Sequence, residues 1–199
     1  ALDKKLRQST QFELVDIQFQ LGVTFIIVTH DQEEAMTLSD RIAIMEQGKF
    51  VQIGEPNSIY ENPNSNFVAD FIGNINLFNA KITSTNDDDA SFYCEALGGE
   101  IVIKKSIQDR SVKDVTLALR PEKMIIQKES PSNEGTNFIS GVVEDFGYFG
   151  NLSIYRVRTN NGDIIQVSKQ NRMRAEQPIK WEDEVYLSWE NENLIILEK

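Results

Sequence analysis

The stretch Leu-Ser-Ile-Tyr-Arg-Val-Arg-Thr-Asn-Asn-Gly-Asp-Ile-Ile-Gln-Val-Ser, residues 152–168, decides the fold of the sequence around it. It contains two runs rich in β-branched and apolar residues, Leu152–Val157 and Ile164–Ser168, on either side of the pair Asn161-Gly162. Asparagine and glycine tolerate the positive φ angles that tight turns require. The pattern therefore predicts two strands joined by a turn.

Runs of the same kind recur on both sides of this stretch, separated by turn residues such as Gly98-Gly99 and residues 191–193. They are Phe78–Thr83, Phe92–Ala96, Ile101–Lys104, Val115–Leu119, Met124–Lys128, Ile139–Asp145, Val185–Trp189 and Leu194–Leu197. Evenly spaced short strands with almost no helical periodicity are typical of a small barrel or sandwich. Residues 76–199 are therefore predicted to form an all-β domain.

Residues 1–75 have a different pattern, in which helix and strand signals alternate as they do in α/β folds. Apolar residues at helical spacing run from Leu2 to Leu21, and Gly22 supplies a stop. Residues 23–28, Val-Thr-Phe-Ile-Ile-Val, have no polar alternation, which predicts a strand buried on both faces of a parallel sheet. The remaining expected elements are a helix capped by Asp31, a hairpin of Arg41–Met45 with Lys49–Ile53, and short helices from Pro56 to Glu61 and over Phe67–Ile72.

Composition limits the classes of function. The 199 residues carry a formal net charge of −11, which argues against a nucleic-acid-binding protein, because such proteins need a basic surface for the phosphates. Cys94 is the only cysteine and His30 the only histidine, so an intrachain disulfide and a His/Cys zinc site are excluded. Cys94 is expected to act as a small core residue.

The chain has no run of about 18 apolar residues and no charged-then-apolar leader, so we expect a soluble protein that acts at a membrane only through partners. The first residue is Ala1, and the opening residues have the character of the middle of a longer element. We therefore expect Ala1 to be an edge within a longer protein.

His30 is the most specific candidate for chemistry. It follows directly on the predicted buried strand, and in open α/β sheets ligands gather at the carboxyl ends of strands. A histidine there can donate an N–H to a phosphate oxygen. The structural alternative is a partly buried histidine that bonds a backbone carbonyl, and position alone favours it. Asp3 taken alone is explained by capping of the first helix.

Three groups of residues, in this order and spacing, resemble the final third of an ABC transporter ATPase domain. They are Ala1-Leu2-Asp3, then residues 28–35 (Val-Thr-His-Asp-Gln-Glu-Glu-Ala), then residues 39–45 (Ser-Asp-Arg-Ile-Ala-Ile-Met) with Gly48 and residues 53–56. Residues 71–79 resemble the bridge found in spermidine/putrescine importer subunits. Leu119-Arg120-Pro121-Glu122 is similar to the recurring element of the appended TOBE domain, an OB-like β module.

The resemblance implies the C-terminal part of a P-loop ABC ATPase domain over residues 1–75, followed by a TOBE domain over residues 76–199. It implies that His30 is the switch histidine that contacts the ATP γ-phosphate, and that Asp3 belongs to the D-loop at a homodimer interface. ATP and Mg²⁺ are the implied cofactors of the intact subunit. The implied partners are a second copy, integral-membrane permease subunits and, indirectly, a solute-binding protein. The implied location is the cytoplasmic face of the cell membrane.

One departure from the family limits this chain. No segment has the form G-x-x-x-x-G-K-[ST], because Gly48-Lys49 is followed by Phe50 and lacks the earlier glycine. The loop that holds the phosphates and the Mg²⁺-bound oxygen is therefore absent. We expect the intact subunit to hydrolyse ATP to energise polyamine import, and this chain alone not to. No metal site is expected within it.

Three alternatives stay open. The β domain could be a regulatory module that binds a polyamine through acidic residues, namely Asp87, Asp88, Asp89, Glu144 and Asp145. The importer could move a sugar or an inorganic ion instead. An oligonucleotide-binding barrel could stack bases on Tyr148, Phe149, Trp181 and Trp189, but core or interdomain packing of these aromatics is the stronger expectation. Arg120 and Glu122 either pair at a strand end or serve at an interface between subdomains.

Overall fold

The computed structural model describes residues 4–104, 113–131, 137–172 and 178–198. The chain divides into two compact units, an N-terminal unit of residues 1–73 and a β unit of residues 74–199. Each unit is described here by itself. Asp3 lies outside the described residues.

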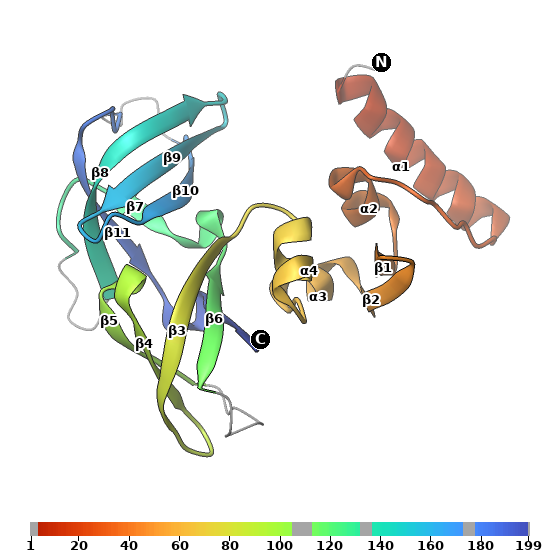
Figure 1. Cartoon of the computed structure of the whole chain (residues 1–199). Coiled ribbons are helices and arrows are strands. Elements are labelled where there is room, and N and C mark those ends of the chain that lie inside the picture. Colours follow the sequence, from red (N-terminus) through yellow and green to blue (C-terminus); the bar gives the residue numbers. More distant parts are fainter. Residues whose placement is uncertain (1–3, 105–112, 132–136, 173–177, 199) are drawn as a thin grey trace. The chain divides into compact units, whose positions relative to one another are not determined.

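The β unit contains two antiparallel five-stranded sheets that curl around a common core (Figure 1). The first sheet has the order β12-β6-β3-β4-β5 and the second β10-β9-β8-β11-β7. The strands are β3 (Asn76–Thr85), β4 (Ala90–Cys94), β5 (Gly99–Ile103), β6 (Asp114–Leu119), β7 (Ile125–Gln127), β8 (Asn137–Tyr148), β9 (Leu152–Thr159), β10 (Ile164–Gln170), β11 (Glu184–Trp189) and β12 (Ile195–Glu198). Short 3₁₀ turns cover Glu95–Leu97, Pro121–Lys123 and Asn191–Asn193. All ten strands predicted from the sequence are present.

The hairpin predicted around Asn161-Gly162 is confirmed. Strands β9 and β10 pair antiparallel, and Gly162 has a φ of 89°, in the left-handed region. The Thr159 N–H donates to the Asp163 carbonyl at 2.9 Å, and the Gly162 N–H donates to the Thr159 carbonyl at 3.0 Å. A residue with a side chain would be strained at this glycine, so the Asn-Gly pair is what allows the tight turn.

One hydrophobic core fills the space between the two sheets. Its members alternate along each strand with exposed residues, as a half-buried sheet requires. Two strands depart from this alternation: all five residues from Val115 to Leu119 in β6 are buried, and so are the last three residues of β11. Cys94 is fully buried in this core, which confirms the expectation that it packs as a small apolar residue.

Two buried polar side chains, those of Asn76 and Arg120, form hydrogen bonds that hold the first residues of the β unit in place. Asn76 lies in β3, and its amide pairs with the backbone of Gln166 in the other sheet: Oδ1 accepts from the Gln166 N–H at 2.9 Å, and Nδ2 donates to the Gln166 carbonyl at 2.8 Å. Arg120 is 1% exposed, and its Nη1 donates to the Asn74 carbonyl at 3.2 Å. Because Arg120 is buried, the small energy expected for an ion pair between exposed Arg120 and Glu122 side chains does not apply to it.

Gly141 in β8 leaves no room for a side chain. A Cβ at this position would lie 2.5 Å from the Arg158 carbonyl oxygen and 2.7 Å from Val157 Cγ1 on β9. We expect Gly141→Ala to lower the free energy of unfolding of the β unit by about 2–3 kcal/mol, because the two strands must separate. Chemical denaturation followed by the fluorescence of buried Trp189 measures this. Ser140→Ala on the same strand is the control, and equal effects of the two changes would contradict the packing argument.

The N-terminal unit consists of four helices and one hairpin within the described residues (Figure 1). They are α1 (Lys4–Leu21), α2 (Gln32–Leu38), β1 (Ile42–Glu46), β2 (Lys49–Gly54), α3 (Pro56–Glu61) and α4 (Asn66–Phe71). All five element predictions other than the buried strand are confirmed, including the stop at Gly22, which has a φ of 62°. A small core of Ile42, Ile44, Ile59, Val68 and Ile72 holds β1 to α3 and α4.

The predicted buried strand over residues 23–28 is wrong for this structure. These residues form no regular element, and Ile26 and Val28 are 90% and 93% exposed. A strand needs neighbouring strands to bond its N–H and C=O groups. Within the described part of this unit, the two strands β1 and β2 pair only with each other, so residues 23–28 have none.

Among the described residues, no helix combines the length and the apolar character that a membrane span requires.

Candidate functional site

His30 lies in the bend that leads from residues 23–28 into α2, and its side chain is exposed. The Asp31 N–H donates to the Thr29 hydroxyl oxygen at 2.9 Å, which closes a tight turn around the histidine. Within the described part of the chain, no hydrogen bond occupies the imidazole. The alternative of a partly buried histidine bonded to a backbone carbonyl is therefore not found, and the ring is free to donate to a ligand.

Helix α2 begins directly after this bend. Asp31 is its N-cap, and its carboxylate accepts from the Glu34 N–H at 3.1 Å. This is the capping pattern expected from Asp31 and Glu34. Glu33 and Glu34 add negative charge to the first turn of the helix. Together with Asp31, they offset the positive end of the helix dipole. The helix start thus repels an anion, and any phosphate near the bend depends on the imidazole.

The structure adds Gln32 to this region. The sequence predicts no role in binding or catalysis for this residue. Its side-chain amide bonds the backbone of Phe71 and Gly73, at the far end of the N-terminal unit's sequence. This contact cannot be predicted from a local sequence pattern, because Gln32 is 39 residues from Phe71 and 41 residues from Gly73 in the sequence.

No metal site is found in the part of the chain that the structure describes, since no three His, Cys, Asp or Glu side chains group closely enough to hold an ion. The environment of Cys94 does not activate it as a nucleophile: burial in the core raises the pKa of its thiol, against two weaker backbone hydrogen bonds that lower it. The thiol is therefore protonated at neutral pH.

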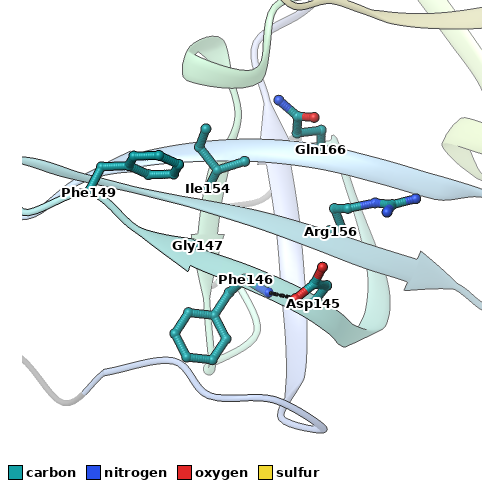
Figure 2. A pocket seen from close by; sticks show the side chains of 7 residues that line it. All are labelled: Asp145, Phe146, Gly147, Phe149, Ile154, Arg156 and Gln166. Atoms are coloured by element: carbon teal, nitrogen blue, oxygen red, sulfur yellow. Dashed lines mark hydrogen bonds between the residues drawn. The ribbon is translucent and has the colours of Figure 1, made fainter.

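A shallow pocket of about 180 Å³ lies on the outer side of β8, β9 and β10 (Figure 2). Its lining consists of Asp145, Phe146, Gly147, Phe149, Ile154, Arg156 and Gln166. Asp145 and Arg156 stand opposite each other in the β8–β9 register, so their charges offset. Asp145 also accepts from the Phe146 N–H at 2.8 Å. The pocket is smaller than usual ligand sites, which measure roughly 300–1,000 Å³, and it presents no net charge to a ligand.

The acidic residues of the polyamine-sensing alternative do not converge. Residues 87–89 lie in the turn between β3 and β4, where the Asn86 side chain accepts from two backbone N–H groups. Glu144 and Asp145 lie on β8, in the other sheet (Figure 1). Glu144 forms an ion pair with Arg158, and Asp145 faces Arg156. The two acidic groups therefore do not form one cation site.

The four aromatic residues weighed for stacking have separate environments. Trp189 is 2% exposed and belongs to the core, as expected. Tyr148, Phe149 and Trp181 are exposed, so these three are not core residues of the β unit, and their packing between domains stays a prediction. Tyr148 ends β8 and Phe149 follows it, whereas Trp181 precedes β11.

Known proteins resemble both units of this chain in sequence. The model of the TOBE domain matches residues 117–197. The chain is 45% identical over 201 aligned residues to the putrescine transport ATP-binding protein PotG of Escherichia coli, covering 99% of this chain and 52% of that protein. It is 40% identical to the spermidine/putrescine import ATP-binding protein PotA of Thermotoga maritima, covering 100% of this chain and 54% of that protein. The chain thus spans about half the length of the curated relatives it matches.

A solved structure shares its fold with part of this chain. The cytoplasmic molybdate-binding protein ModG, in a form with molybdate bound, aligns with a TM-score of 0.54 over 62% of this chain and 96% of that protein. The identity is 13%, so the likeness concerns the fold alone.

The two curved sheets, the matched TOBE residues and the alignments over the whole of this chain agree with one another. The chain has a C-terminal TOBE domain and is a homologue, over its whole length, of the ATP-binding proteins of spermidine and putrescine import, whose C-terminal part it matches.

Proposed function

We propose that this chain is the C-terminal part of the ATP-hydrolysing subunit of an ABC-type importer for polyamines. The observation that carries the proposal is the alignment of the whole chain with putrescine and spermidine/putrescine transport ATP-binding proteins at 40–45% identity. The exposed, unoccupied imidazole of His30 directly before α2 supports it from the structure.

His30 is the one residue here that we assign to the nucleotide. Its ring is accessible and can donate an N–H to an oxygen of the ATP γ-phosphate. Because α2 starts with Asp31, Glu33 and Glu34, the imidazole and not the helix terminus faces that oxygen. When bound, ATP with Mg²⁺ supplies the γ-phosphoryl group for transfer to water. In this proposal His30 orients that group and stabilises charge that develops on it.

The other parts of the nucleotide site come from residues outside this chain. The described residues hold no cluster of metal ligands, and the sequence has no phosphate-binding loop. The exposed apolar segment 23–28 fits the same proposal: in the intact subunit it forms a strand whose neighbours come from the half of the protein that this chain does not span. In this proposal the chain alone, without a phosphate-binding loop, is expected not to hydrolyse ATP.

The proposed assembly is a homodimer of the intact subunit on the cytoplasmic face of the membrane, with permease subunits and, indirectly, a solute-binding protein. Asp3 is assigned to the D-loop at the dimer interface. Residues 1–75 are assigned to the α/β ATPase domain and residues 76–199 to the TOBE domain.

The transported solute is tested by reconstitution of the intact subunit with its permease and solute-binding protein in lipid vesicles. We expect spermidine or putrescine to raise the rate of ATP hydrolysis about tenfold or more over the basal rate, because substrate delivery closes the dimer around ATP. A sugar and molybdate serve as matched controls. Stimulation by either control, with none by polyamines, would assign the importer to that solute class instead.

A further inference from the structure

Gln32 connects the His30 bend to the end of α4. It is the first residue of α2, two positions after the histidine. Its Nε2 donates to the Phe71 carbonyl, and its Oε1 accepts from the Gly73 N–H at 2.9 Å. One side chain thus holds two backbone groups that lie 39 and 41 residues away in the sequence.

Both backbone groups need a partner of this kind. Phe71 is the last residue of α4, and the final carbonyls of a helix have no partner within it. Gly73 follows the C-cap Ile72 and has a φ of 76°, the left-handed conformation in which helices end. A glutamine amide offers one acceptor and two donors in a plane, so it satisfies both groups at once.

The next residues are bound within the β unit. The Asn74 carbonyl accepts from buried Arg120, and the Asn76 side chain pairs with Gln166. Gly73 and Asn74, adjacent in the chain, are therefore each fixed by a side chain of their own unit.

We propose that Gln32 is a positioning residue that fastens the His30 bend to the end of α4, and so ties the placement of the imidazole to the connector Gly73-Asn74. The role given to the imidazole rests on the proposed function. The fastening itself rests only on the two bonds of the Gln32 amide and on the capping of α4.

The fastening is tested on the chain as it is, by amide hydrogen exchange resolved at single residues. We expect Gln32→Ala to raise the exchange rate of the Gly73 amide about tenfold or more, because the amide loses its only hydrogen-bond partner among the described residues. Gln32→Glu keeps the side-chain length but cannot donate to Phe71 when ionised, so it should weaken the contact as well. Glu33→Gln, exposed on the same helical turn, is the control and should leave Gly73 protected.

Two results would overturn the fastening. One is unchanged exchange at Gly73 in Gln32→Ala. The other is an equal rise at Ile59 and Val68 in the unit's core, which would mean general loosening. A rise confined to residues 71–73 supports it.

The positioning role is tested by a double-mutant cycle in the intact subunit. Gln32→Ala should lower kcat for ATP hydrolysis about tenfold, with KM for ATP changed less than about twofold, since the imidazole is displaced rather than lost. In a His30→Ala background the same change should cost less than about twofold, because its effect passes through His30. A full additional tenfold loss there would overturn the role.

The two tests separate the proposals. If His30→Ala leaves turnover unchanged, the assignment of His30 to ATP falls, and exchange at Gly73 still decides whether Gln32 fastens the bend.

Discussion

Replacing His30 by alanine in the intact subunit is expected to lower kcat for ATP hydrolysis about 100-fold or more, with little change in KM for ATP. Loss of one donor aimed at developing charge typically costs a factor of about 10²–10³ in turnover. KM changes little because the contact strengthens mainly in the transition state. The folded protein should not be affected: the ring is exposed and unbonded among the described residues, so the free energy of unfolding should change by less than about 0.5 kcal/mol.

Steady-state hydrolysis and chemical denaturation of the same preparations check this prediction. His30→Gln is the matched variant, since it retains an N–H donor with a different reach, and it should recover part of the turnover. Unchanged turnover in His30→Ala would remove the histidine from the mechanism. A large loss of stability would show instead that the side chain has a structural role.

Replacing Asn76 by aspartate is expected to lower the free energy of unfolding of the β unit by about 3 kcal/mol at neutral pH. Asn76 is 8% exposed, and its Nδ2 donates to the carbonyls of Gln166 at 2.8 Å and Leu119 at 3.3 Å. A carboxylate cannot donate, so it would face these two carbonyl oxygens as a buried negative charge. The change therefore removes both bonds that Nδ2 donates, and only the bond accepted from the Gln166 N–H still joins β3 to the edge strand β10.

Denaturation of wild type and variant at several pH values tests the cause. Protonation of the new carboxyl restores one donor, so the destabilisation relative to wild type should shrink as the pH falls toward 4. Asn79→Asp, on the same strand with an exposed side chain, is the control and should cost less than about 1 kcal/mol. A pH-independent effect equal to that of the control would contradict the role of the Asn76 amide.

The local elements of this protein follow from local sequence. The turn at Asn161-Gly162, the cap at Asp31 and the stop at Gly22 each depend on the backbone preferences of one or two residues, and the structure has all three. The segment 23–28 differs for a physical reason. Its apolar composition suits a buried strand, but a strand forms only where another backbone accepts its hydrogen bonds, and the described residues provide none.

The contacts that define the candidate site could be predicted only in part. His30 is visible in the sequence because its position after an apolar run, within the motif Val28–Ala35, points to phosphate contact. The Gln32 contact with Phe71 and Gly73 is not visible, and neither is the burial of Arg120. Both depend on which backbone groups are left unbonded once the helices and sheets have packed.

Sequence alone determined the ten short strands and the helices of this protein, because strand and helix periodicities and the turn and capping residues act over a few neighbours. Tertiary structure alone decided that Asn76 joins the two sheets, that Gln32 binds the end of α4, and that the acidic residues of the β unit stay apart. A hydrogen bond between residues 40 or 90 positions apart depends on the path of the whole chain between them, and no local preference encodes that path.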